Sequence, residues 1–257
     1  MPSHLVLIPS YNSGPRLLST VREVLRTGYP LWVIVDGSTD QSFAPVLAMT
    51  PSEPNLKVVF RESNGGKGAA VLTGAIAAVQ AGFTHALVMD SDGQHPVDHI
   101  EPFMQTSRAH PNALILGTPI FGPEVPKERL HGRKLSVGLV NFETCGGGID
   151  DPLFGFRIYP LASFIEVMRR MTFGRGFDFD PEVAVKLFWA GVPTVNLPAP
   201  CRYLSKADGG VSHFHYLRDN VKMIWLHTRL IAQFLLLRWP AARRAHRAWR
   251  QSRVSAS

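Results

Sequence analysis

The sequence has few of the features that mark secreted or membrane-spanning chains. Its 257 residues include two cysteines, Cys145 and Cys201, which form no C-x-x-C pair, so we expect a reducing cytosol and no disulfide framework. Residues 1–4 carry no basic segment of the kind that opens a signal peptide. The longest uncharged stretch near the C-terminus, residues 230–237, falls short of the ~20 apolar residues that cross a bilayer.

Acidic residues are absent from the end of the chain. None follows Asp219, whereas eight lysines and arginines do, which is more than the formal net charge of +7 of the whole chain. A basic segment of this kind requires an anionic partner, and membrane lipid and nucleic acid are the two candidates. We find no nucleic-acid recognition motif. We therefore expect an anionic membrane surface as partner, no nucleic acid, and a cytoplasmic chain held peripherally on the inner face of the cytoplasmic membrane.

Short apolar runs alternate with helical patterns over residues 4–117. The runs lie at residues 5–8, 32–35, 56–60, 86–89 and 113–116. Runs of this length and composition are typical of buried strands in a mostly parallel sheet. The segment at residues 67–80 has the apolar spacing of a crossover helix. The pattern predicts a doubly wound α/β fold, in which ligands bind beyond the carboxyl ends of the strands.

Polar loops follow the first four predicted strands. They are residues 9–12 (Pro-Ser-Tyr-Asn), 36–40 (Asp-Gly-Ser-Thr-Asp), 64–68 (Asn-Gly-Gly-Lys-Gly) and 90–95 (Asp-Ser-Asp-Gly-Gln-His). One such loop is an ordinary turn, because these residue types dominate turns for backbone reasons. Four of them at one edge of one sheet indicate a binding site.

Asp90 and Asp92 flank Ser91 at the end of the fourth predicted strand. In an extended segment, residues two apart point to the same side, so the two carboxylates can share one hard cation. Mg²⁺ and Mn²⁺ prefer such oxygen ligands and complete their coordination with water and substrate phosphates. A solvated turn is the alternative, but the neighbouring loops favour a divalent cation that neutralises a departing diphosphate.

Two further strand-end residues are candidate nucleotide contacts. Asp36 sits where a carboxylate accepts hydrogen bonds from a base or ribose, although a helix N-cap or Asx-turn is the alternative. Asp40, later in the same loop, fits that alternative better. Residues 64–68 open a helix with glycines that admit an anion to its N-terminus, so Lys67 is a phosphate or nucleotide contact, or else a solvated lysine.

The second half of the chain is predicted to be largely helical, with helical patterns at residues 129–144, 181–190 and 216–239. The simplest division is a domain at residues 1–210 and an amphipathic helical extension with a basic tail at residues 211–257. The last helix, rich in Leu, Ile, Phe and Trp, is either interfacial or packed on the domain ahead of a disordered basic tail. We expect the nearby histidines to be structural or acceptor-facing rather than metal ligands; they are His213, His215 and His227.

The ordered motifs resemble a family 2 glycosyltransferase of the GT-A fold, nearest the dolichyl/polyprenyl-phosphate sugar synthase branch. The matching segments are residues 8–12, 35–40, 64–68, 88–96 and 155–157, and the resemblance covers roughly residues 4–205. It implies a Rossmann-like GT-A domain and inversion at the anomeric carbon by direct displacement. The residues it implies are Pro9, Tyr11 and Asp36 near the donor base with Lys67 nearby, Asp90 and Asp92 on the metal, and Ser91 and Gln94 beside the metal and diphosphate.

The sequence departs from the family pattern after the fifth predicted strand. The branch usually has Gly-Ser-Arg there, with the arginine on the donor diphosphate, whereas this chain has Gly-Thr-Pro at residues 117–119. That contact is therefore missing or supplied by another arginine, and the candidates are Arg129, Arg133 and Arg202. A surface salt bridge is the alternative for each of them.

Asp180 is the candidate general base. It lies within residues 178–182 (Asp-Phe-Asp-Pro-Glu) and resembles the Asp of the family's Glu-Asp base motif. A sugar hydroxyl needs such a base, whereas a polyprenyl phosphate is already an anion, so Asp180 slightly favours a hydroxyl acceptor. The alternative is that Asp180 N-caps the following helix, with Pro181 at the first helical position. Asp150 and Asp151 are weaker base candidates.

We therefore expect an inverting glycosyltransferase that uses a UDP- or GDP-sugar and Mg²⁺ or Mn²⁺, with Asp92 and Asp180 as its catalytic residues. Its expected acceptor is lipid-linked or lipid-like. The alternative is a catalytically silent nucleotide-binding, membrane-associated module of the same fold, which the complete set of strand-end residues disfavours. The donor base, the sugar and the choice between a phosphate and a hydroxyl acceptor stay open at this point.

Overall fold

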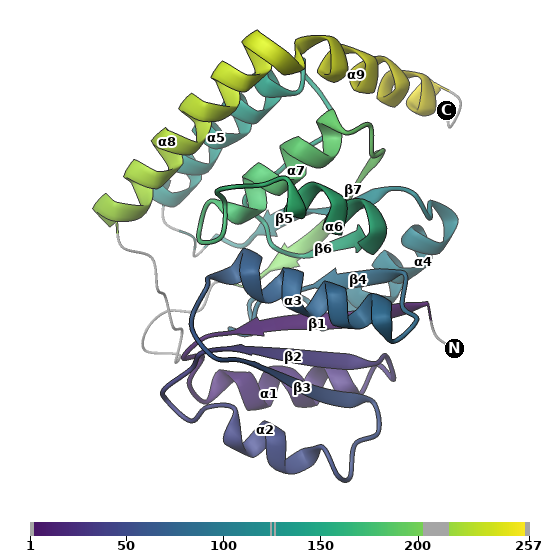
Figure 1. Ribbon diagram of the computed structural model, residues 1–257, viewed down its shortest axis with the longest axis vertical. Helices are drawn as coiled ribbons and strands as arrows, with labels where there is room; N and C mark the ends of the chain where they lie inside the picture. The colour runs from purple at the N-terminus through teal and green to yellow at the C-terminus, as the bar shows by residue number, and fades with distance from the viewer. Residues whose placement is uncertain (1–2, 124, 126, 203–215, 255–257) are drawn as a thin grey trace.

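A seven-stranded sheet forms the centre of the molecule (Figure 1). The computed structural model describes residues 3–123, 125, 127–202 and 216–254. From one edge of the sheet to the other, the strands run in the order β3-β2-β1-β4-β6-β5-β7. Their bounds are β1 His4–Ser10, β2 Leu31–Asp36, β3 Leu56–Arg61, β4 His85–Val88, β5 Leu114–Phe121, β6 Arg157–Pro160 and β7 Thr194–Cys201.

All neighbouring strands are parallel except at β6. This strand pairs antiparallel with both β4 and β5, with Tyr159 opposite Ala86 and Ile158 opposite Ile115. β1 to β5 confirm the five strands that the apolar runs predict, and the doubly wound, mostly parallel sheet is confirmed with them. The carboxyl ends of β1, β2, β3 and β4 lie at one edge of the sheet, where the polar loops follow.

Helices cover both faces of the sheet and separate two apolar cores. One core lies beneath α1, α2 and α4, and the other lies beneath α3, α6 and α7. α3 has the bounds that the sequence predicts for the crossover helix. The bounds are α1 Arg16–Leu25, α2 Ala44–Met49, α3 Lys67–Gln80, the 3-10 turn η1 Val97–His99, α4 Ile100–Ala109, α5 Lys127–Glu143, α6 Leu161–Arg169 and α7 Phe179–Trp189.

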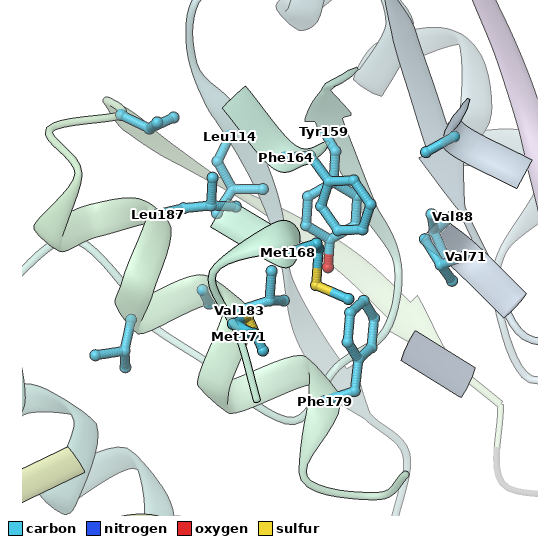
Figure 2. Packing of buried hydrophobic residues seen from close by; sticks show 14 of the residues in the cluster. Val71, Val88, Leu114, Tyr159, Phe164, Met168, Met171, Phe179, Val183 and Leu187 are labelled. Carbon is cyan, nitrogen blue, oxygen red and sulfur yellow. The ribbon is translucent and has the colours of Figure 1, made fainter. Parts of the chain in front are cut away.

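The core beneath α6 and α7 fixes the start of α7 (Figure 2). Tyr159 of β6 contacts Phe164 of α6, with ring centroids 4.7 Å apart, and Phe164 meets Phe179 edge-on at 6.3 Å. Met168, Met171 and Val183 of α7 belong to the same core as these rings. Phe179 is therefore held inside the core. Asp180, which follows it, is thereby placed near the carboxyl ends of the parallel strands.

The C-terminal segment packs on the domain through one face. It consists of α8 (Tyr216–Gln233), the π-helical turn η2 (Phe234–Arg238) and α9 (Trp239–Val254). His227 lies 2.9 Å from buried Glu143 of α5, and Arg229 lies 3.0 Å from buried Glu182 of α7. Packing on the domain, one of the two predicted alternatives, therefore describes the inner face of α8.

The predicted boundary between residues 210 and 211, together with His213 and His215, falls within residues 203–215 and so outside the described residues. The division into two parts stays a prediction. Within the described residues, no helix combines the length and the apolar character needed to cross a membrane.

Candidate active site

Side chains tie the first two strand-end loops together. Asn12 Oδ1 accepts hydrogen bonds from Thr39 N at 2.8 Å and from Asp40 N at 3.3 Å. Asp40 in turn accepts from Gly14 N at 3.0 Å and from Ser42 N at 3.1 Å, and the latter bond forms an Asx-turn. The structural role predicted for Asp40 is confirmed.

Asp36 is buried beneath the third loop. Its carboxylate accepts hydrogen bonds from Arg61 Nε at 2.6 Å, Gly65 N at 3.1 Å and Gly66 N at 2.9 Å. A carboxylate held by a guanidinium and two backbone N–H groups fixes the path of the loop that supplies them. The described partners of Asp36 all belong to the protein, and a contact with the donor base or ribose stays a prediction.

Lys67 joins two carboxylates from distant parts of the chain. Its Nζ lies 2.7 Å from Asp90 Oδ1 and 2.7 Å from Asp180 Oδ2. Burial lowers the pKa of Lys67, but the two carboxylates outweigh burial and raise this pKa above its usual value. The structure therefore replaces the solvated-lysine alternative with an ammonium that bridges two anions.

Glycines leave room for this bridge. Gly66 has a φ of +85°, and a Cβ at this position would lie 2.2 Å from Arg175 O. Gly68 N donates to the same carbonyl oxygen at 2.9 Å. On the other side of the site, a Cβ at Gly155 would lie 2.4 Å from Lys67 Nζ. A side chain at either glycine would thus move the backbone or the ammonium.

Asp90 and Asp92 differ in acidity. Burial would raise the pKa of Asp90, but Lys67, His95 and Arg157 lower it to about 2. Burial and the charge of Asp90 raise the pKa of Asp92. Two close carboxylates whose acidities diverge in this way would be stabilised by one further positive charge.

His95 is a buried member of the site to which the sequence assigned no role of its own. Asp90 N donates to His95 Nδ1 at 2.9 Å, so the neutral ring carries its proton on Nε2, 3.6 Å from Asp90 Oδ2. The ring also contacts Phe154 and Phe156. Burial lowers the pKa of His95 despite the nearby carboxylates. His95 therefore orients Asp90 as a neutral group, and its sequence signal was its position in the fourth loop.

Asp180 lies in the first turn of α7 and does not cap it. The helix begins at Phe179 with Asp178 at the N-cap position, so the N-cap alternative for Asp180 is wrong. The physical reason is that the core buries Phe179 and starts the helix earlier than Pro181 suggests. Among the described residues, Asp180 Oδ1 is buried without a hydrogen-bond partner, 4.0 Å from Arg157 Nη1.

Arg157 holds three backbone carbonyl groups from inside the protein. Its guanidinium donates to Phe154 O at 2.8 Å, to Pro152 O at 2.6 Å and to Asp180 O at 2.6 Å. It therefore fixes the loop that carries Gly155 relative to the start of α7. Arg157 belongs to the segment at residues 155–157 (Gly-Phe-Arg) that carries part of the family resemblance, but its structural role was not predictable from the sequence.

The two arginines expected near the diphosphate have different surroundings. Arg133 Nε and Nη2 donate to the two carboxylate oxygens of Asp151, the second at 2.9 Å, in a largely buried ion pair rather than a surface salt bridge, and a contact of Arg133 with the diphosphate stays a prediction. Arg202 has an exposed side chain, and its N donates to Gln94 O at 3.0 Å, which brings the end of β7 to the fourth loop. Arg202 stays a candidate for a donor contact, and the side chain of Arg129 is outside the described part.

Ser91 connects the first loop to the fourth. Its Oγ lies 2.7 Å from Ser13 Oγ, which lies 2.9 Å from Ser10 Oγ. In the same loop Pro9 is half-buried, and Tyr11 has an exposed fraction of 38%. The ring of Tyr11 is thus accessible at the edge of the sheet where the resemblance expects the donor base.

The donor atoms suit a hard divalent cation but do not enclose one. Among the described residues, no group of three or more His, Cys, Asp and Glu side chains is arranged to hold a metal. Asp90 and Asp92 provide carboxylate oxygens, and the bound ammonium of Lys67 shows that Asp90 accepts a positive charge. Mg²⁺ typically uses one or two carboxylates plus water and substrate phosphates. The residues therefore fit a cation that binds together with a diphosphate.

Sequence comparison identifies the class of protein. The profile of Glycosyl transferase family 2 matches residues 5–177. The chain belongs to this family and is a glycosyltransferase.

Three curated relatives agree with the resemblance to the dolichyl/polyprenyl-phosphate branch. The polyprenol monophosphomannose synthase of Mycolicibacterium smegmatis is 26% identical, with 76% of this chain and 75% of the relative covered. A dolichyl-phosphate beta-glucosyltransferase of Trichomonas vaginalis is 25% identical, with 75% and 64% covered. The UDP-N-acetylglucosamine–dolichyl-phosphate N-acetylglucosaminyltransferase of Methanococcus voltae is 26% identical, with 60% and 68% covered.

Solved structures show the same GT-A fold. Residues 1–349 of S. aureus TarS in complex with UDP-GlcNAc match with a TM-score of 0.57 at 18% identity, covering 90% of this chain and 66% of that one. A longer structure of S. aureus TarS matches with a TM-score of 0.59 at 19% identity, covering 92% and 40%. The chain thus spans about two thirds or less of these proteins, and the likeness concerns the fold alone.

Proposed function

We propose that the chain transfers a sugar, with inversion, from a UDP- or GDP-sugar to a lipid-linked acceptor, assisted by a divalent cation at Asp90 and Asp92. The observation that carries this proposal is the convergence of Lys67, Asp90 and Asp180 at the edge of the sheet, with both ion-pair distances at 2.7 Å. The family and the names of the three curated relatives support the reaction class and the lipid-linked acceptor.

The acceptor that we propose is a polyprenyl-type phosphate. One oxygen of Asp180 is paired with Lys67, and the other is buried, so this carboxylate is poorly presented as a proton acceptor for a sugar hydroxyl. A phosphate acceptor is already an anion and needs no general base. The geometry therefore favours the phosphate over the hydroxyl acceptor that Asp180 alone suggested.

Donor binding would use groups that are already in place. The group that the third loop offers to the diphosphate is the ammonium of Lys67, because the N–H groups of Gly65 and Gly66 already donate to Asp36. Lys67 can exchange its contact with Asp90 for a phosphate oxygen while it stays paired with Asp180. Asp90 is then free to join Asp92 as a ligand. A bound divalent cation supplies charge neutralisation of the leaving diphosphate.

Transfer would be a single displacement. The acceptor phosphate oxygen forms a bond to the anomeric carbon while the bond from that carbon to the diphosphate oxygen breaks, so the configuration inverts. The chain contributes by holding the two reactants in line, because orientation alone lowers such barriers substantially. Arg157 would act as a positioning residue here, since it fixes Asp180 and the Gly155 loop together.

Donor and cation binding can be tested by thermal unfolding with UDP, GDP, TDP or CDP in the presence of Mn²⁺. At a ligand concentration 100 times Kd, binding adds about 2.7 kcal/mol, which corresponds to a rise in Tm of roughly 5–11 °C for a domain of this size. Asp92→Ala should remove the part of the shift that depends on Mn²⁺. An unchanged Tm with all four nucleotides would contradict the proposed donor class.

Acceptor choice can be tested with the purified full chain, a labelled nucleotide sugar and Mn²⁺. We expect label on a short-chain polyprenyl phosphate and none on the matching polyprenol, which lacks the phosphate. Labelling of the polyprenol or of free sugar alcohols alone would contradict the phosphate acceptor.

A further inference from the structure

α8 and η2 carry an uncovered apolar stripe on their outer side. Eight exposed residues of α8, η2 and the first position of α9 recur at the spacing of one helical face, and all but one threonine are apolar: Val221, Ile224, Trp225, Thr228, Ala232, Leu235, Leu236 and Trp239. Ile224 is 68% exposed and Leu236 is 79% exposed. We call these eight residues the outer stripe.

The inner side of the same helix is also apolar. Leu226, Leu230 and Phe234 are buried in the core beneath α7. The two polar side chains on this side of α8, His227 and Arg229, pair with Glu143 and Glu182. A surface helix of a globular protein usually pairs one apolar face with one polar face. A helix that is apolar on both sides, with one side open, marks a contact surface.

The apolar surface continues toward the active site. The guanidinium of Arg229 lies 4.3 Å from the ring of Phe173 and 5.9 Å from that of Trp225, so it connects the outer stripe to the loop before α7. Phe173 is 48% exposed. Lys222 Nζ lies 3.8 Å from the point that a Cβ on Gly176 would occupy, in that same loop. The first turns of α8 therefore border the segment that leads to Asp180.

The charge beside the outer stripe identifies its occupant. α9 follows η2 directly and exposes Arg243, Arg244, Arg247 and Arg250, and no acidic residue follows Asp219. The guanidinium of Arg243 lies 4.3 Å from the ring of Trp239, where the stripe ends. An apolar strip that continues into a cationic helix matches a bilayer with anionic headgroups. A second copy of the chain would instead bring a further cationic helix to the same place.

We propose that the outer stripe lies in the headgroup region of an anionic bilayer, with the arginines of α9 on the lipid phosphates. Figure 1 shows α8 and α9 as the outermost helices at the end of the molecule opposite α2. In this orientation an acceptor headgroup reaches the Asp180 edge of the sheet along the membrane surface. The proposed membrane contact rests on the outer stripe and on the arginines of α9. Only its role in bringing the acceptor to the site rests on the proposed function.

The test uses the full chain and vesicles of phosphatidylcholine with or without phosphatidylglycerol, in a co-sedimentation assay. We expect binding to the anionic vesicles. The double variant Ile224→Gln, Leu236→Gln should bind at least ten-fold more weakly, because two apolar side chains lose their burial in lipid. Arg244→Gln with Arg247→Gln should reduce the preference for phosphatidylglycerol and its sensitivity to salt. Leu47→Gln on α2, which is also an exposed leucine, should bind as the wild type does.

Two outcomes would overturn the docking inference. One is equal vesicle binding by the wild type and the Ile224, Leu236 variant. The other is a dimer in solution that this variant converts to a monomer, which would assign the stripe to a second copy. Transfer to a short-chain, water-soluble polyprenyl phosphate separates the two proposals. If the variant loses vesicle binding while the wild type shows no transfer at all, the docking inference stands and the proposed function fails.

Discussion

Replacing Lys67 by methionine should destabilise the free protein and make it depend on a divalent cation. Methionine keeps much of the length of the side chain but removes the ammonium that lies 2.7 Å from both Asp90 and Asp180. The variant then leaves Asp90 and Asp180 without the ammonium that pairs with both, although the guanidinium of Arg157 still lies 4.0 Å from Asp180 Oδ1. A divalent cation that binds the carboxylate oxygens would again neutralise their negative charge.

The size of the effect follows from burial. Removing one partner of a buried ion pair costs about 3–5 kcal/mol, but Asp90 is 36% exposed and Lys67 is 21% exposed, so solvent screening lowers the expected loss to about 2–3 kcal/mol. For a chain of this size, that loss corresponds to a fall in Tm of roughly 4–12 °C. Mn²⁺ should raise the Tm of the variant more than that of the wild type.

The same variant should change the acid side of the stability profile. The folded-state pKa of Asp90 is depressed to about 2, so its contribution is present above the usual value of 3.8 and is lost as the pH falls from about 4 to about 2. Without Lys67 this pKa moves up, and the loss of stability over that pH range becomes smaller. The difference between the two profiles, rather than either profile alone, separates the two carboxylates that pair with Lys67, Asp90 and Asp180, from the other carboxylates.

The assay is thermal unfolding of both proteins at pH 7 with and without Mn²⁺, and then across pH 4 to 2 without metal. Lys134→Met removes an exposed lysine from α5 and serves as the matched control. Equal Tm values for Lys67→Met and wild type without metal would refute the bridging role of Lys67. Equal Mn²⁺ shifts would refute the idea that the ammonium and the cation compete for Asp90.

Three further substitutions test other contacts. Gly155→Ala should lower kcat/KM for transfer at least ten-fold, because its Cβ displaces the ammonium that it faces, whereas Gly138→Ala, which meets nothing within 4 Å, should not. Asp180→Asn should reduce kcat by less than about 100-fold if the acceptor is a phosphate, since loss of a general base costs about 10²–10⁴-fold, and a larger loss in steady-state assays would restore the hydroxyl acceptor. Glu182→Gln should cost about 3–5 kcal/mol in urea unfolding, because it leaves buried Arg229 without its anion, and a loss under 1 kcal/mol would contradict this.

The first half of the fold was predictable because its signals are local. β1 to β4 are short, largely apolar runs that end in or are soon followed by Asn, Asp or Ser, and α3 has an apolar face bounded by glycines. β6 and β7 have no such signal. β6 begins with Arg157, a buried charge that donates to two nearby carbonyl groups and to the distant carbonyl group of Asp180. β7 contains Pro198 and Pro200, which are tolerated because β7 is the last strand of the sheet.

The candidate site was predictable to the same extent. The sequence predicts that Lys67 lies near Asp90, because the loops that follow parallel strands lie together at the carboxyl ends of those strands. It cannot place Asp180, which lies 113 residues from Lys67 in the chain and reaches it through the packing of Phe179. Nor does it show that Arg133 is engaged by Asp151, because an ion pair across 18 residues depends on tertiary geometry.

The antiparallel insertion of β6 has a consequence for the order of folding. β1, β2 and β3 can form a parallel unit from the first part of the chain, but the second edge of β4 has no partner until residues 157–160 have been made. An open strand edge invites wrong pairing, and distant contacts form late. Asp180 is made later still. A chain that ends before it therefore has the strand-end loops of the site but lacks the carboxylate that Lys67 bridges to Asp90. Pulse-labelled hydrogen exchange should show protection in β1 and β2 before β5 and β6, and simultaneous protection would contradict this order.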